Sequence, residues 1–145
     1  MATKTAVKAK ASKGKGFTED EKGAMRARVR ELQGQADGEN EALAKIAAMP
    51  PADRTLARRV HALVKAAAPQ LSAKTYYGMP AYARDGKVVF WYKAAAKFKT
   101  RYATIGFSDG AKLDDGTLWP TEYAVTDMNP ATEARISALI KKAAG

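Results

Sequence analysis

Residues that could carry out covalent chemistry are scarce in this chain. The sequence contains no cysteine and one histidine, His61, which excludes a thiol nucleophile and a zinc site built on cysteine ligands. His61 lies in a predicted helix with no carboxylate three or four residues away to orient it as a base. The glycines are scattered and form no phosphate-binding loop. The residue types therefore favour a protein that binds over one that catalyses a reaction.

Aromatic residues are the second distinctive feature. Eleven of the twelve lie between Tyr76 and Tyr123. Apolar and aromatic walls with a few charged groups are typical of small-molecule sites, whereas aromatic residues on half-buried strands belong mostly to the core. Both interpretations stay open. The residues proposed for a ligand cleft are Tyr77, Met79, Pro80, Tyr82, Trp91, Lys97 and Trp119.

Two adjacent carboxylates, Asp114 and Asp115, stand directly before Gly116. Their hard oxygen ligands suit a hard cation, but Asp-Asp-Gly is equally typical of a turn. The sequence therefore offers either a weak metal site at Asp114 and Asp115 or a simple turn.

The charge of the chain points to a polyanionic partner as the alternative to a small ligand. The formal net charge is +10, and residues 1–16 contain five lysines without an acid. Such a segment has little to bury and is predicted to be disordered, either as a solubilising tail or as an arm for nucleic acid. Basic rows are also predicted on two helix faces. The residues expected to contact nucleic acid non-specifically are Lys4, Lys8, Lys10, Lys13, Lys15, Arg54 and Arg58.

Capping signals divide the first half of the chain into helices. Thr18 and Glu21 form a capping box at the start of the first helix, which Gly34 and the Asp37-Gly38 pair are expected to end. Asn40 is predicted to cap a short second helix with Leu43, Ile46 and Ala47 turned inward. A third helix is predicted over residues 52–67, and a last one begins at Asn129-Pro130.

Strand signals fill the region between those helices. Asp85-Gly86 between two aromatic and β-branched runs predicts a type I′ hairpin. Alternation places Val88, Phe90 and Tyr92 on one face of the second run and Val89 and Trp91 on the other. Strands are expected over residues 81–84, 87–93, 97–107 and within 118–126, and a short helical turn over residues 70–77.

This order predicts a two-layer α+β domain, with an antiparallel sheet of about four to five strands packed against N-terminal and C-terminal helices. Its parts are a disordered Lys-rich tail (1–16), a helical extension (17–41) and the main domain (42–145). No apolar run approaches the length of a membrane span and no secretory signal is evident. We expect a cytoplasmic protein without a membrane partner.

A set of motifs resembles the YdhG-like domain family over about residues 42–144. The motifs are the Tyr-Gly-Met-Pro-Ala-Tyr string from Tyr77 to Tyr82, the Asp85-Gly86-Lys87 turn, Lys97-Phe98, Ile105-Gly106-Phe107, the helix ending at Ala68-Pro69 and the C-terminal helix from Ile136 to Ala143. The resemblance implies a frataxin-like fold. One branch of that family resembles a bacterial intracellular iron chaperone, which makes iron the metal to expect at any cation site.

Overall fold

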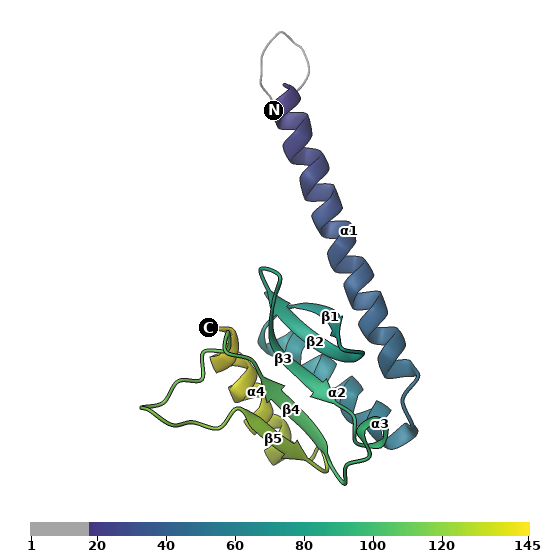
Figure 1. Cartoon of the computed structure of the whole chain (residues 1–145), viewed down its shortest axis with the longest axis vertical. Helices are drawn as coiled ribbons and strands as arrows, with labels where there is room; N and C mark the ends of the chain where they lie inside the picture. Colours follow the sequence, from purple (N-terminus) through teal and green to yellow (C-terminus); the bar gives the residue numbers. More distant parts are fainter. Residues whose placement is uncertain (1–17) are drawn as a thin grey trace. The chain divides into compact units, whose positions relative to one another are not determined.

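The computed structural model describes residues 18–145 and contains four helices and five strands. In chain order the elements are α1 (Glu19–Ala47), α2 (Pro51–Ala67), β1 (Ser72–Tyr76), β2 (Met79–Arg84), β3 (Lys87–Lys93), α3 (Ala95–Phe98), β4 (Ala103–Phe107), β5 (Glu122–Val125) and α4 (Pro130–Ala144) (Figure 1). The α+β class predicted from the sequence is confirmed. No helix within residues 18–145 is long and apolar enough to cross a membrane.

The described chain divides into two units between residues 34 and 35, and α1 contributes to both. The predicted boundary between residues 41 and 42 falls inside α1. The second unit holds the whole sheet and the other helices, so the candidate site is built from it alone.

The predicted starts of α1 and α4 are confirmed by their capping bonds. The amide of Glu21 donates to Thr18 Oγ1 over 3.1 Å, and the amide of Thr18 donates to Glu21 Oε1 over 2.8 Å. At α4 the amide of Thr132 donates to Asn129 Oδ1 over 2.9 Å, with proline at the first helical position. Each bond satisfies an amide that a helix start leaves without an intrahelical partner.

The predicted break after Gly34 is wrong, because α1 runs unbroken through Gly38 to Ala47. Gly38 serves a close approach instead: a Cβ there would lie 2.8 Å from the carbonyl oxygen of Ala73 in β1. Glycine is thus retained in the helix interior, despite its conformational entropy, because the helix backbone meets the strand backbone. Leu43 and Ala47, both predicted to be inward, are exposed, whereas Ala42 and Ile46 are buried.

The five strands form one antiparallel sheet in the order β1-β2-β3-β4-β5. The hairpin predicted at Asp85-Gly86 is confirmed, with φ of +52° and +83°. A second hairpin of the same kind turns at Tyr77-Gly78, with φ of +50° and +77°. Residues 72–76 therefore form a strand and not the helical turn predicted for this stretch, because pairing with β2 outweighs weak local preference.

A bulge in β3 alters the predicted alternation. Ala83 pairs with Val88 and Tyr82 with Phe90, which leaves Val89 as the extra residue. The two residues of a bulge point to one side of the sheet, and Val89 and Phe90 are both buried in the core. The prediction that Val89 faces away from Phe90 is therefore wrong.

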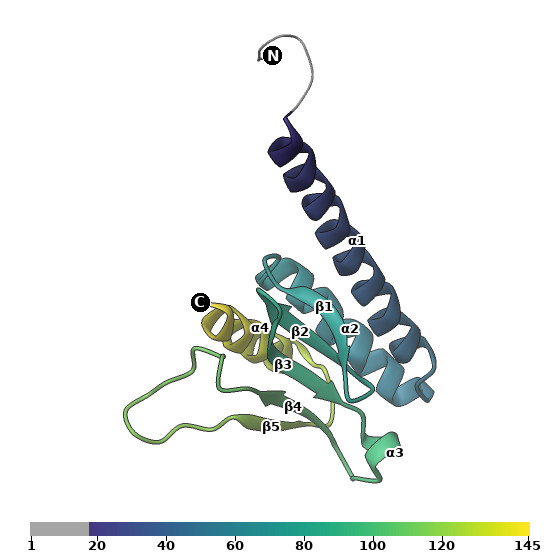
Figure 2. The same cartoon turned by 45° about the horizontal axis from the view of Figure 1, so that its top comes forward.

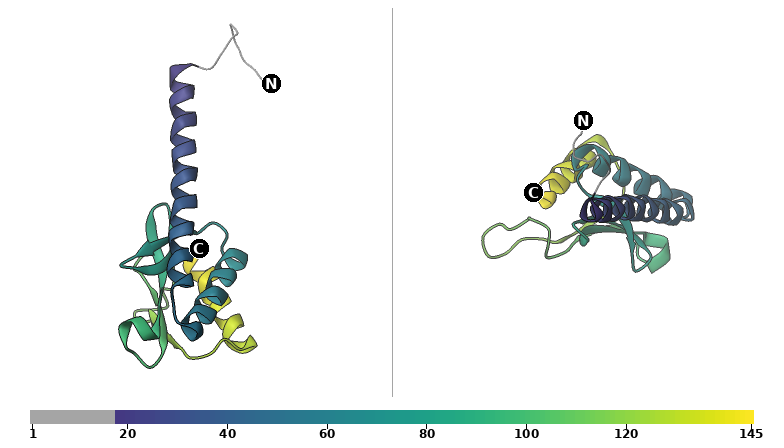
Figure 3. Two further views of the ribbon diagram at one scale, coloured as in Figure 1. Left: turned by 90° about the vertical axis from the view of Figure 1, so that its right-hand side faces the viewer. Right: turned by 90° about the horizontal axis from the view of Figure 1, so that it is seen from above.

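Helices α2 and α4 pack against each other and lie on one face of the sheet (Figures 1 and 2). Viewed from above, they form one layer and the strands form the other (Figure 3). Their apolar sides meet Tyr82, Phe90, Tyr92, Ile105 and Phe107 to form the core. We call the sheet face away from α2 and α4 the outer face.

The long strand predicted over residues 97–107 is also wrong in its first half. Residues 95–98 form the short helix α3, which ends where Lys99 adopts φ +55°, and the strand starts only at Ala103. Three consecutive alanines before Lys97 favour helix over strand. This turn of helix places Lys97 and Phe98 beside the sheet, where the candidate site lies.

Candidate binding face

Strand register assigns Trp91 to the outer face. Trp91 pairs with Ala81 on β2 and with Gly106 on β4, one residue out of step with the core pair of Tyr82 and Phe90. A Cβ at Gly106 would lie 2.4 to 2.7 Å from three atoms of the Trp91 ring. The indole therefore packs directly on the Gly106 backbone. A side chain at position 106 would occupy the space that the indole fills.

Three rings follow one another across the outer face and onto the hairpin tip. The Trp91 and Tyr76 ring centres are 5.8 Å apart with an interplanar angle of 39°, and those of Tyr76 and Tyr77 are 4.6 Å apart at 71°. Ala81 lies on the strand between Tyr76 and Trp91, and its small side chain leaves the rings room to meet. Tyr76 and Trp91 are half-buried, whereas Tyr77 is 82% exposed.

Lysines from β3 and α3 meet beside this row of rings. Lys97 Nζ donates to the carbonyl oxygen of Gly78 over 3.3 Å and lies 5.7 Å from the Phe98 ring centre. Lys93 Nζ lies 5.0 Å from the same ring. A cation at this distance is attracted by the electron-rich face of the ring. The group of Tyr76, Tyr77, Trp91, Lys93, Lys97 and Phe98 is called the aromatic-lysine face below.

The sequence around this face is strongly basic. Residues 71–108 contain five lysines and two arginines against one acid, Asp85, a net charge of +6. Among residues 18–145, neither Lys93 nor Lys97 forms an ion pair. The nearest acid in register on the outer face is Glu122 on β5, which pairs with Gly106 on β4 and so lies two strands away from Trp91. The lysine end of the face is therefore free to meet an anion.

A buried acid, Asp53 in α2, fixes the position of α3. The amides of Ala95 and Ala96 donate to its two carboxylate oxygens, each over 3.1 Å. Asp53 is 5% exposed and is the one charged residue in the described core. The start of α3 has no capping side chain of its own, so Asp53 supplies the cap from another helix. Sequence reasoning missed this role because it required knowing which elements meet.

The seven residues predicted to line a cleft do not share one surface. Tyr82 is 1% exposed in the core beneath the helices, and Pro80 is also fully buried. Trp119 packs against the same core from the loop before β5. Tyr77, Met79, Trp91 and Lys97 do come together, since Met79 pairs with Tyr76 on the outer face.

His61 has partners that the sequence did not reveal. Its Nδ1 lies 2.9 Å from the Tyr82 hydroxyl, and its Nε2 lies 3.2 Å from Glu39 Oε2. Lys65 Nζ, one turn along α2, lies 2.6 Å from the same carboxylate oxygen. Burial, and secondarily the charge of Glu39, raises the pKa of the Tyr82 hydroxyl well above its usual range. The hydroxyl stays protonated, and the group joins α1, α2 and β2 without exposing a nucleophile.

Glu39 gives this group a pH dependence. The hydrogen bond from Lys65 lowers the pKa of Glu39, more than burial raises it. A carboxyl whose pKa is lower in the folded than in the unfolded chain stabilises the fold above its unfolded pKa, and loses this contribution as the pH falls through its folded pKa. We expect Glu39→Gln to cost about 1 kcal/mol at pH 7, with the difference from the native chain shrinking as the pH falls below the usual glutamate pKa of about 4.3.

Urea unfolding at pH 7, 5 and 3 measures this difference, with Glu41→Gln, an exposed acid of the same helix, as the control. A gap between Glu39→Gln and the native chain that stays constant over this pH range would contradict the assignment.

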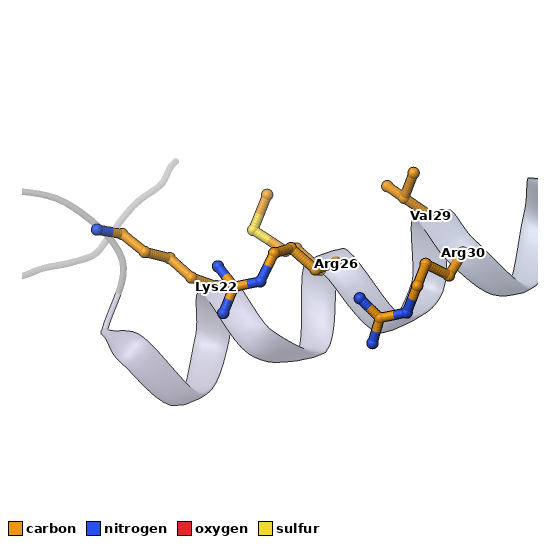
Figure 4. Close-up of a pocket in the computed structure, with 5 residues that line it drawn as sticks. Lys22, Arg26, Val29 and Arg30 are labelled. Atoms are coloured by element: carbon orange, nitrogen blue, oxygen red, sulfur yellow. The ribbon is translucent and has the colours of Figure 1, made fainter.

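The residues predicted for nucleic acid fall in separate places. Lys4, Lys8, Lys10, Lys13 and Lys15 lie outside the described residues. Arg54 and Arg58 lie on α2, half-buried and exposed respectively. In the first unit, Lys22, Arg26 and Arg30 line a pocket at α1 with Met25 and Val29 (Figure 4).

The predicted metal residues Asp114 and Asp115 are exposed in the loop between β4 and β5. Within residues 18–145 no group of three or more histidine, cysteine, aspartate or glutamate residues is placed to hold a metal ion.

No family model, curated protein or solved structure matches this chain.

Proposed function

We propose that this protein is a non-catalytic binding protein for nucleic acid and that the aromatic-lysine face is its binding surface. The observation that carries the proposal is the pairing of exposed rings with lysines that have no acidic partner among residues 18–145. Basic side chains contact phosphates, and aromatic rings offer surfaces for bases. The surrounding charge of +6 over residues 71–108 supports this class of ligand.

The basic N-terminal segment and the α2 arginines have a secondary place in this proposal. Their phosphate contacts would add affinity that does not depend on the shape of the nucleic acid, as is general for non-specific binding. The role of iron carrier implied by the family resemblance is less well supported, because the described residues offer no cluster of hard ligands.

The test is fluorescence anisotropy with a labelled 20-nucleotide strand over a series of salt concentrations. Replacing Lys93 and Lys97 of this face with glutamine, together with the exposed Lys99 at the end of α3, should weaken binding about tenfold or more. The slope of log affinity against log salt should fall by about two, because each single-strand phosphate contact contributes about 0.7.

Arg135→Gln, Lys141→Gln and Lys142→Gln together form the matched control, since they remove the same charge from exposed positions on α4. A full-length variant with glutamine at the five tail lysines separates the contribution of residues 1–16. The proposal fails if no strand binds at low salt. It also fails if binding depends on the tail lysines and is unchanged in the Lys93, Lys97 and Lys99 variant.

A further inference from the structure

We infer that the aromatic-lysine face takes single-stranded nucleic acid and stacks an unpaired base on Tyr77. This inference rests on the proposed function and specifies its ligand. The feature that carries it is the position of Tyr77, a large ring that is 82% exposed at the tip of the β1–β2 hairpin and is nevertheless held by a neighbour.

The backbone of this hairpin is unusual for a tyrosine. Tyr77 occupies the first central position of the turn with φ +50°, where asparagine, aspartate or glycine is preferred. A bulky residue at positive φ costs conformational energy and is a genuine outlier. The other two-residue turn of the same sheet uses the ordinary pair, Asp85-Gly86. An outlier of this kind, on an exposed ring, points to a role for the ring itself.

The Tyr77 ring is positioned before any ligand arrives. It meets Tyr76 edge to face at 4.6 Å, and Tyr76 in turn meets Trp91, which rests on Gly106. This chain of contacts reduces the entropy that stacking a base would otherwise cost. Most of the Tyr77 surface remains open because the ring is held by only one neighbour in this row.

A cation contacts the residue next to Tyr77, where it can meet the phosphate of a stacked nucleotide. Lys97 Nζ contacts the carbonyl of Gly78, the residue next to Tyr77. Lys97 also lies over Phe98, which Lys93 approaches from β3. One surface thus presents a free ring face and two neighbouring ammonium groups. A duplex conceals its base faces, so this arrangement favours a strand whose bases are unstacked.

The experiment compares three ligands on the full chain: a 12-nucleotide single strand, a hairpin duplex of the same composition, and a strand of the same length with abasic sites. The native protein should bind the intact strand most tightly. The variant Tyr77→Asn should bind the intact strand about 5- to 150-fold more weakly, the range for removing one stacked base. Its affinity for the abasic strand should not change, because the phosphate contacts remain.

Asparagine is chosen because it suits the turn, so that a loss of affinity cannot be ascribed to unfolding. Thermal unfolding should confirm that Tyr77→Asn is at least as stable as the native chain. Tyr77→Phe keeps the ring and should keep the affinity, which distinguishes stacking from a hydrogen bond of the hydroxyl.

The outcomes separate the two claims. If the duplex and abasic strand bind as tightly as the intact strand, and Tyr77→Asn changes nothing, stacking is refuted while nucleic-acid binding stands. If affinity falls equally for intact and abasic strands in Tyr77→Asn, the residue acts on phosphate and the inference is also wrong. If no strand binds at low salt, both the inference and the proposed function fall.

Discussion

Asp53→Ala is expected to lower the free energy of unfolding by about 2–3 kcal/mol, as estimated from the loss of a helix cap and of hydrogen bonds to a charged group. The substitution removes both acceptors for the amides of Ala95 and Ala96 and leaves them without a partner at the start of α3. It should also weaken strand binding, because α3 carries Lys97 and Phe98. Urea unfolding and the anisotropy assay measure the two effects.

Two variants test whether the cap is the cause. Asp53→Asn retains one acceptor oxygen and should lie between the native chain and Asp53→Ala. Asp109→Ala removes an exposed acid from the loop after β4 and should stay within about 0.5 kcal/mol of the native chain. If Asp53→Ala leaves both stability and binding unchanged, α3 does not depend on this cap.

Gly106→Ala is expected to destabilise the fold by about 1–3 kcal/mol, the usual cost of overpacking. The new methyl group would occupy space held by the Trp91 ring, less than 3 Å away. The sign is informative, because alanine in place of glycine within a strand should otherwise stabilise by about 0.5–1 kcal/mol. Displacing Trp91 should also loosen Tyr76 and Tyr77 and lower the affinity for a single strand.

Tryptophan emission reports the displacement of Trp91 directly when Trp119→Phe is used as the background. A shift of the emission to longer wavelength is expected in Gly106→Ala, since the displaced indole meets more water. Gly110→Ala is the matched control: a Cβ there meets its nearest neighbour at 3.5 Å, an ordinary contact. Equal stability and unchanged emission in Gly106→Ala would show that the ring does not depend on glycine.

Signals confined to neighbouring residues predicted local structure well. The capping box of Thr18 and Glu21, the Asn129 cap and the Asp85-Gly86 turn are each confirmed, because every partner lies within three residues. The α+β class follows from the order of such elements. The glycine at position 38 misled the same reasoning, because its cause is contact with the backbone of β1 and not a helix end.

The candidate site could be predicted only in part. The clustering of aromatic residues pointed to Tyr77 and Trp91. Successive residues of a strand, however, face opposite sides of the sheet, so a shift of one position moves a side chain from the core to the outer face. Tyr82 was grouped with them because register cannot be read from composition. Asp53 and Glu39 were missed for a related reason: their partners lie on other elements, 42 and 22 residues away in the sequence.

The approach of α1 to β1 at Gly38 has a consequence for association between molecules. A sheet of five strands has two edge strands, and an uncovered edge strand can pair with a strand of another chain. The helix backbone meets the Ala73 carbonyl of β1 too closely to admit such a partner there. Lateral growth of the sheet is thereby directed to β5, whose four residues offer only a short template.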